Sequence, residues 1–109
     1  MTSNFDPIPL NLTSQAALRI IQAAAADSAR VFLTHHAKQR MKERKITLTQ
    51  ILDCLRRGRI SEPPHRDIHG NWKCNVSRFH AGEDVTVSVG IKRDEQTGDF
   101  LIVITVFGG

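Results

Sequence analysis

Cysteine is scarce in this 109-residue sequence, and long hydrophobic runs are absent from it. The two cysteines, Cys54 and Cys74, allow one disulfide at most, which excludes a small disulfide-stapled fold and favours reduced thiols. No apolar run approaches the roughly 20 residues that span a bilayer, and the N-terminus lacks the basic-then-apolar order of a signal peptide. We therefore expect a cytoplasmic protein that has no membrane partner.

Several motifs that carry chemistry are also missing. The sequence contains no phosphate-binding loop, no dinucleotide fingerprint and no nucleophile elbow. His65, His69 and His80 accompany the two cysteines, but no Cys-x-x-Cys occurs and the spacing does not match that of a zinc site. We therefore expect neither a bound metal nor another cofactor.

The overall composition is that of an ordinary globular domain. Hydrophobic residues make up 40% of the chain and charged residues 24%, which sets aside disordered and low-complexity proteins. The length limits the chain to one compact domain. Pro7 and Pro9 predict a flexible N-terminal arm over residues 1–12, and this leaves residues 13–109 as the single domain.

Hydrophobic periodicity predicts helices in the first half of the chain and strands in the second. A capping box of Thr47 and Gln50 begins one helix, which Gly58 ends, and after Gly58 the period falls from about 3.6 to 2. We expect helices over residues 13–29, 35–45 and 48–57 and strands near 31–33, 59–62, 72–79, 84–92 and 100–107. The last strand is apolar on both faces, which predicts a central position. The pattern indicates an α+β fold whose N-terminal helices pack on a twisted antiparallel sheet of four to five strands.

The positive charge is concentrated in one segment. The whole chain has a formal net charge of +4, whereas residues 35–60 alone contain eight cations and two anions, a net charge of +6. A basic stripe of this kind attracts a phosphate-rich partner, because each neutralised phosphate releases a counterion. Helices also carry solvated lysines and arginines without binding anything, so charge alone leaves both interpretations open.

His36, Arg40 and Arg44 form one row on the predicted helix 35–45, since residues four apart are neighbours. The row drifts toward the apolar stripe of Ala37 and Met41, which predicts that Arg44 is the most enclosed of the three. An imidazole moves protons near neutral pH, and guanidinium groups bind a scissile phosphate. If the substrate is RNA, its own 2′-hydroxyl serves as nucleophile and no metal is needed. The alternative is structural: the arginines extend over a neighbouring strand and His36 caps the helix.

A wider signature runs through this segment: His36-Ala37-x-x-Arg40-Met41-x-x-Arg44-x-Ile46-Thr47, then a leucine-containing helix, Gly58 and a closing Ile104-Thr105-Val106-Phe107. It resembles the bacterial domain-of-unknown-function family 4258 (DUF4258) over roughly residues 17–107. Lys45 stands where members often carry Gly. That family looks like a branch of the RelE/ParE-like toxin group, within a wider class of small metal-independent ribonucleases that pack two helices against a four-stranded antiparallel sheet. The resemblance implies a RelE-like fold, cleavage of RNA or of ribosome-bound mRNA, and a neutralising antitoxin as partner.

The resemblance and the charge pattern together name the candidate site. By the resemblance, His36, Arg40, Arg44 and Thr105 are the catalytic candidates. Cleavage also needs a second proton-transfer group, for which the sequence offers His35, His80 or Lys73. The rival hypothesis is a module without catalytic activity that uses the same basic helix to bind nucleic acid or a protein. The candidates for further nucleic-acid contacts are Lys38, Arg56, Arg57, Arg59, Lys73 and Arg78.

Overall fold

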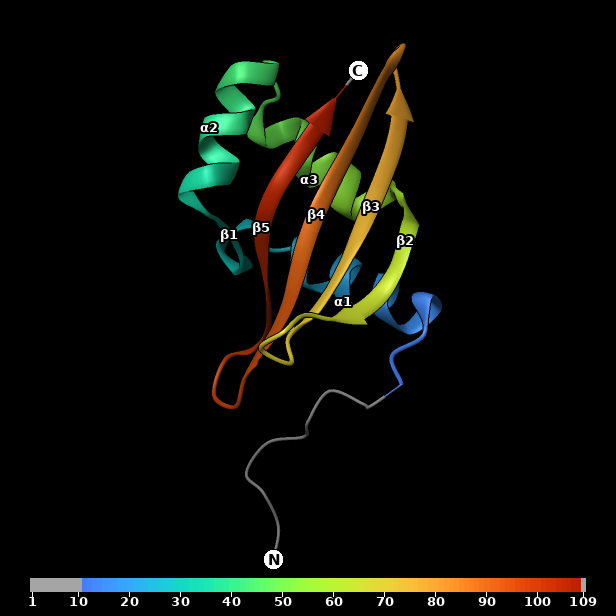
Figure 1. The fold of residues 1–109 in the computed structure, drawn as a ribbon, viewed down its shortest axis with the longest axis vertical. Helices are drawn as coiled ribbons and strands as arrows, with labels where there is room; N and C mark the ends of the chain where they lie inside the picture. The colour runs from blue at the N-terminus through green and yellow to red at the C-terminus, as the bar shows by residue number, and fades with distance from the viewer. Residues whose placement is uncertain (1–10, 109) are drawn as a thin grey trace, which may run out of the picture.

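The computed structural model describes residues 11–108 (Figure 1). The elements follow in the order α1 (Ser14–Ala25), η1 (Ser28–Arg30), β1 (Val31–Leu33), α2 (His35–Arg44), α3 (Leu48–Arg57), β2 (Arg59–Arg66), β3 (Trp72–His80), β4 (Glu83–Asp94) and β5 (Gly98–Gly108). Residues 1–10 of the expected N-terminal arm lie outside the described residues, and Leu12 at its end is buried. The helices and strands expected from the sequence are present, so the α+β class is confirmed.

The five strands form one sheet in the order β1-β5-β4-β3-β2. Neighbours from β5 to β2 are antiparallel, whereas β1 is parallel to β5, with Val31 opposite Leu101 and Leu33 opposite Val103. The expectation of a purely antiparallel sheet is therefore wrong, and the sheet is mixed. Strand β5 lies between β1 and β4, so the predicted central position of the last strand is confirmed. The chain leaves β1 through two helices before it returns to the sheet, and a long connection of this kind permits parallel pairing that a hairpin does not.

Side chains at the helix starts determine where the helices begin. The Thr47–Gln50 capping box at α3 is present as predicted. Helix α1 ends at Ala25 instead of continuing to residue 29, and Asp27 accepts the backbone N–H of Ala29 at 3.0 Å to cap a separate turn. Lys45 ends α2 in the left-handed conformation with φ 56°, so a lysine adopts there the backbone that a glycine adopts at least cost.

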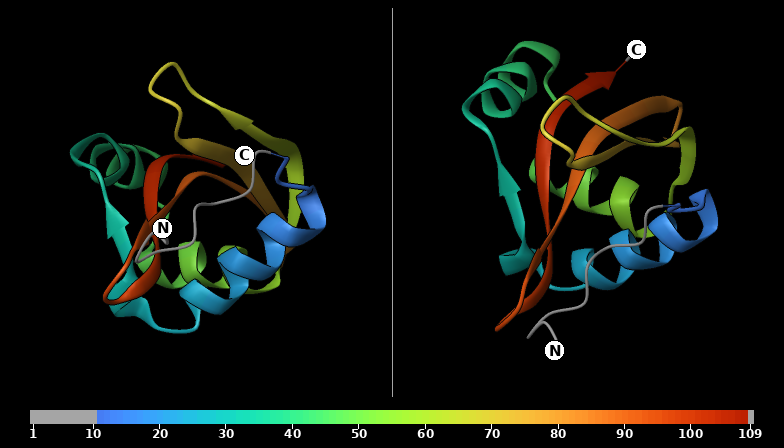
Figure 2. Two further views of the ribbon diagram at one scale, coloured as in Figure 1. Left: turned by 90° about the horizontal axis from the view of Figure 1, so that it is seen from below. Right: turned by 60° about the horizontal axis from the view of Figure 1, so that its bottom comes forward.

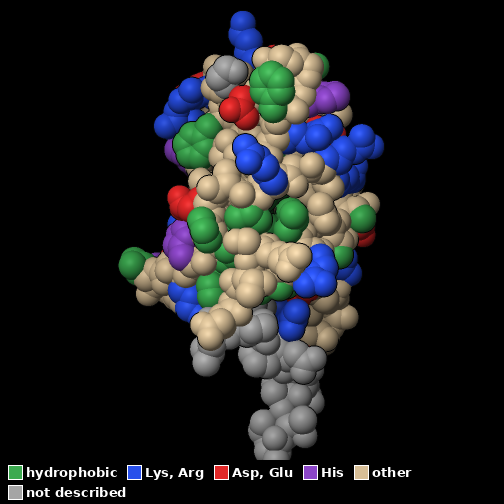
Figure 3. Space-filling model, turned by 90° about the vertical axis from the view of Figure 1, so that its right-hand side faces the viewer, with side chains coloured by type: hydrophobic (Ala, Val, Ile, Leu, Met, Phe, Trp, Pro, Cys, Tyr) green, Lys and Arg blue, Asp and Glu red, His purple; other side chains and the backbone are tan. Residues whose placement is uncertain are grey.

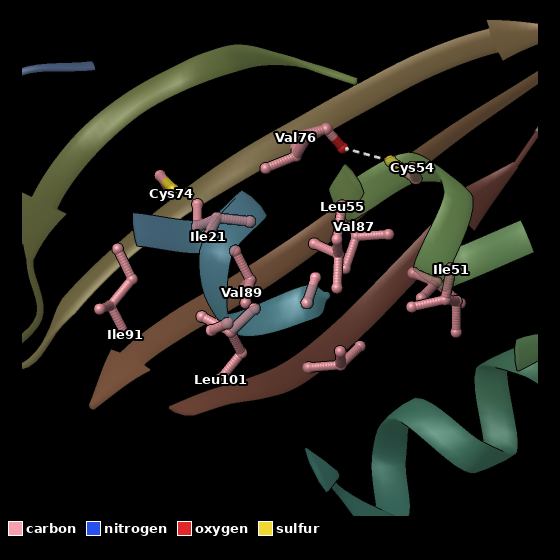
Figure 4. Packing of buried hydrophobic residues seen from close by; sticks show 14 of the residues in the cluster. Ile21, Ile51, Cys54, Leu55, Cys74, Val76, Val87, Val89, Ile91 and Leu101 are labelled. Carbon is pink, nitrogen blue, oxygen red and sulfur yellow. Dashed lines mark hydrogen bonds between the residues drawn. The ribbon is translucent and has the colours of Figure 1, made fainter. Parts of the chain in front are cut away.

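The hydrophobic core lies between α1, α3 and one face of the sheet (Figures 2 and 4). Alternate residues of the three central strands point into it, as the period-2 pattern predicts. Its largest fully buried members include Ile21, Ile51, Leu55, Val76, Val87, Val89, Ile91 and Leu101. Cys54 and Cys74 are buried free thiols, and burial raises the pKa of each to about 12. Both cysteines therefore act as apolar core residues.

The opposite face of the sheet is open. In the described part of the chain no helix covers it, and α2 lies beside the β5 edge while the β2–β3 hairpin curls forward on the other side (Figures 1 and 2). The open face thus has a helix along one side and the β2–β3 hairpin along the other (Figures 1 and 2). None of the described helices combines the length and apolar composition needed to cross a membrane.

Candidate active site

Thr34 fixes the start of α2 against β5. Its Oγ1 caps the helix by accepting the backbone N–H of Ala37 at 2.9 Å and donates to the carbonyl of Ile104 at 3.0 Å. The backbone N–H of Thr34 also donates to the carbonyl of Val103 at 3.1 Å. The start of the helix is therefore hydrogen-bonded to the two residues of β5 that directly precede Thr105. Because Thr34 is the cap, the alternative in which His36 caps the helix is wrong.

The handedness of α2 determines which side chains border the open face of the sheet. Ala37 is fully buried and the helix runs upward beside β5 (Figure 1). In a right-handed helix, the residue before Ala37 and the residue three after it are rotated toward the same side, here the side of the open sheet face. His36 and Arg40 therefore flank that face. Lys38 is rotated the other way and lines a shallow pocket with His35 and other residues on the outer side of α2.

Arg44 departs from the prediction. It is exposed, whereas Arg40 is half-buried, so Arg44 is not the most enclosed of the row. The reason lies just beyond the helix, where Ile46 is buried and fills the space near the end of β5. Arg44 lines a separate pocket of about 150 Å³ with Glu83 and Asp84. The Nη1 of Arg40 lies 3.4 Å from Oε1 of Glu43, an exposed pair that is weak in water.

A β-bulge turns Thr105 toward the open face. Thr105 pairs with Ser88 but Val103 pairs with Val89, and the register shift between them lies next to Thr105. Val103 and Val106 are both fully buried although they are three residues apart, which only the bulge allows. Thr105, between Ile104 and the buried Val106, therefore points away from the core. Bulges of this kind re-aim side chains beside functional sites in other proteins.

Small polar side chains form the middle of the open face. Asn75, Ser88 and Thr105 follow one another across β3, β4 and β5. In the next row, Oγ of Ser77 lies 2.7 Å from Oγ1 of Thr86, and it donates to a second hydroxyl on β2 at 2.7 Å. Sequence reasoning identified Thr105 alone. The alternation of polar with valine residues along β4 was the signal for the others, but it does not say which face stays open.

The two exposed phenylalanines of the upper open face were also missed. Phe79 is 70% exposed at the end of β3, and Phe107 is 45% exposed near the end of β5. Phe107 pairs with Thr86, which places its side chain on the same face as the hydroxyl rows. Large exposed aromatic rings on a polar surface suit stacking against planar groups.

The predicted nucleic-acid contacts divide between two sides of the molecule. Lys73 pairs with Gly90 and Arg59 with Ser77, so both belong to the open face. Lys73 is thus the candidate second proton-transfer group that shares a face with Thr105. His35 lies on the outer side of α2, and Nδ1 of His80 lies 3.5 Å from Arg78 on the helix side of the sheet.

Three of the predicted contacts are arginines engaged in structural interactions around α3. Arg56 donates through Nε to the carbonyl of Ala25 at 2.7 Å, which ties α3 to α1. Arg78 donates to Asp53 at 2.7 Å, and Arg57 lies 3.7 Å from the same carboxylate. Figure 3 views the molecule from the β2 side and shows Lys and Arg side chains in both its upper and its lower part. Arg56, Arg57 and Arg78 lie on the helix side of the sheet and so face away from the open face.

The site has no visible provision for a metal. Among residues 11–108, no group of three or more His, Cys, Asp or Glu side chains is arranged to hold a metal ion. The side chains that border or line the open face carry imidazole, guanidinium, ammonium and hydroxyl groups, whose chemistry allows proton transfer and anion binding.

Comparison with known families agrees with the motif. The model of the domain-of-unknown-function family DUF4258 matches residues 33–108, which include α2, α3, strands β2 to β5 and the bulge at Thr105. The chain belongs to the DUF4258 family. No curated protein and no solved structure gave a significant match.

Proposed function

We propose that this DUF4258 protein is a RelE-like toxin of a toxin–antitoxin pair, a cytoplasmic endoribonuclease that cleaves RNA without a metal. One observation carries the proposal. The Thr34–Ile104 hydrogen bond at 3.0 Å holds the start of α2 beside Thr105, so a histidine and an arginine border an open face of hydroxyl and amide groups. Proton transfer, anion binding and a substrate floor thus meet at one junction.

The proposed reaction is an internal transphosphorylation. The imidazole of His36 takes the proton of a ribose 2′-hydroxyl, the 2′-oxygen forms a bond to the adjacent phosphorus, and the bond from phosphorus to the 5′-oxygen breaks. The leaving 5′-oxygen takes a proton from a second group, for which Lys73 on the open face is the candidate. The products are a 2′,3′-cyclic phosphate and a 5′-hydroxyl.

Charge stabilisation falls to the arginines. Arg40 exchanges its exposed contact with Glu43 for the phosphate oxygens, because a desolvated phosphate binds a guanidinium more strongly than a solvated carboxylate does. Arg44 contributes at longer range from the end of the helix. The hydroxyl group of Thr105 donates a hydrogen bond to the substrate. Preformed donors of this kind are effective because they need no rearrangement as charge develops.

The surface suits single-stranded RNA. Phe79 and Phe107 offer exposed rings on which unpaired bases stack, and Arg59 and Lys73 lie on the same face for phosphate contacts. An mRNA strand that is held in this way can be cleaved, whether or not it is bound to a ribosome. The antitoxin in this proposal is a protein that covers the open face of the sheet and so blocks the substrate.

The rival function is RNA binding without cleavage, and one observation favours it. Arg40, the arginine next to His36 in the row, lies 3.4 Å from the carboxylate of Glu43, which reduces the charge available to a transition state. The test is incubation of the full chain with a 5′-labelled single-stranded RNA in EDTA, followed by analysis of the product ends. Cyclic phosphate ends support the proposal. Binding without cleavage supports the rival, and cleavage that needs added metal contradicts the mechanism.

A further inference from the structure

A pocket of about 400 Å³ is lined by residues of η1, β1 and the β4–β5 hairpin. The strand β1 and the β4–β5 hairpin lie at the lower end of the molecule in Figure 1. Phe32 and Phe100 line it, with ring centroids 5.6 Å apart in an edge-to-face arrangement. Phe32 is 52% exposed although it sits in a strand of three residues. Val31 and Leu33 pack against the core, so Phe32 points to the open face of the sheet. The pocket therefore opens on the same face as the candidate active site.

The rim of this pocket carries both donors and acceptors. Arg30 donates through Nη1 to the carbonyl of Asp99 at 3.1 Å, and its Nε lies 4.0 Å from Asp27. A guanidinium has five N–H donors, so these two contacts leave others for a ligand. Asp94 also lines the pocket, and its Oδ1 accepts the backbone N–H groups of Gln96 and Thr97 at 2.7 and 2.9 Å. These bonds lower the pKa of Asp94 and keep it an ionised acceptor.

We propose that this pocket binds a guanine base of the RNA, an inference that rests on the proposed function and deepens it. Guanine offers O6 and N7 as acceptors, which match Arg30, and N1–H and N2–H₂ as donors, which match the carboxylate of Asp94. Its ring stacks on Phe32, as unpaired bases stack on aromatic side chains. Adenine and cytosine each lack part of this pattern. Uracil lacks the second donor.

The position of the pocket fits a base close to the cleaved phosphate. Four steps along the chain lead from Phe32 to His36, two of them extended and two helical, a path on the order of 10 Å. A base in the pocket therefore belongs to a nucleotide adjacent or nearly adjacent to the phosphate that His36 serves. The pocket sets a sequence preference that the charged surface alone does not provide.

Binding of uncleavable RNA tests this proposal. The probes are four fluorescein-labelled 2′-O-methyl oligouridines of equal length with guanine, adenine, cytosine or uracil at the centre, titrated into the full chain by anisotropy in EDTA. They lack the 2′-hydroxyl nucleophile, so binding is measured apart from cleavage. We expect the guanine probe to bind about tenfold more tightly than the other three, as good paired contacts to one base allow.

Two variants and a matched control assign the preference to the pocket. Asp94→Asn keeps an oxygen for the turn but loses the charge, and it should reduce the guanine preference to about twofold or less. Phe32→Ala should weaken the guanine probe most, by about tenfold. Asp67→Asn is the control, because Asp67 caps the β2–β3 turn through the N–H groups of His69 and Asn71 in the same manner. It should leave all four affinities unchanged.

The outcomes separate this proposal from the proposed function. Equal affinity for the four probes, absence of binding, or a guanine preference that survives Asp94→Asn overturns the guanine pocket, even if RNA is cleaved. A guanine preference that depends on Asp94 and Phe32 supports the pocket. If that preference is present while the unmodified RNA is not cleaved in EDTA, the catalytic proposal fails and the pocket stands.

Discussion

The two sides of α2 are similar in sequence and different in surroundings. One side carries His36 and Arg40, and the other carries His35, Lys38 and Lys42. Both are basic and both are solvent-accessible. The first borders the hydroxyl rows of the open sheet face, whereas the second lines a shallow pocket on the outside of the molecule. The comparison shows that the position on the helix alone does not make a histidine a candidate catalyst. His36 is a candidate because the sheet places hydroxyl groups beside it.

Separate alanine substitutions of the two adjacent histidines test this comparison, and we expect them to give the largest effect. His36→Ala should lower cleavage of single-stranded RNA by about 10²- to 10⁴-fold, the usual effect of losing a general acid or base. His35→Ala removes the same imidazole from the outer side and should leave the rate within about twofold. Single-turnover rates measure both. Equal losses in the two variants would show that the sides of α2 are not functionally distinct.

The cations of the two sides provide a second comparison. Arg40→Ala should lower kcat/KM by about 10- to 100-fold, because a charge-assisted hydrogen bond to phosphate contributes about 1.5–3 kcal/mol. Lys42→Ala should lower it only about twofold through weaker long-range attraction. Arg40→Lys keeps the charge but loses the planar fork, and it should restore only part of the activity. Full activity in Arg40→Ala would remove this residue from the proposed mechanism.

Loss of the Thr34 hydrogen bonds between α2 and β5 should have a smaller effect on cleavage, and its effect on stability can be measured separately. Thr34→Val removes the helix cap and the bond to Ile104, and it should lower the free energy of unfolding by about 1–2 kcal/mol. Cleavage should fall further than stability explains, because His36 loses its position. Thr34→Ser keeps the hydroxyl and serves as the control. Thermal unfolding and cleavage, measured below the transition, distinguish the two contributions, and a Thr34→Val protein with unchanged cleavage would refute the positioning role.

The smallest expected effect concerns salt dependence. Lys73→Ala and Arg59→Ala should each reduce the slope of log affinity against log salt by about 0.7, the value for one contact to single-stranded nucleic acid. Arg57→Ala, on the helix side, should change the slope much less and leave cleavage intact. Titrations at several salt concentrations decide this. A flat dependence in the unmodified protein would reject the electrostatic interpretation altogether.

Much of the fold could be predicted because its signals are local. The Thr47–Gln50 capping box uses side chains three residues apart, and alternation along β4 directly reports one buried face. The parallel direction of β1 could not be predicted in this way. It depends on which strand β1 meets after about 60 residues of intervening chain, and no local pattern encodes that pairing.

For the candidate site, too, local spacing could be predicted and tertiary packing could not. The row of His36, Arg40 and Arg44 follows from helical spacing, but its burial does not, since Ile46 takes the space that the drift of the row assigned to Arg44.

Gly58 was predicted as a helix stop. In the structure a Cβ at Gly58 would lie 2.4 Å from the carbonyl oxygen of Cys54 and 2.7 Å from that of Ser77, so close packing also requires this glycine.

The sequence by itself determined the class of fold, the helix starts and the presence of a basic helix with a histidine, because caps, periodicity and charge act over a few residues. Only the tertiary structure decided that the sheet is mixed, that a bulge turns Thr105 outward, and that Phe32, Arg30 and Asp94 enclose one pocket. These features join residues up to about 70 positions apart. Their geometry results from packing and strand pairing, which are properties of the whole folded chain.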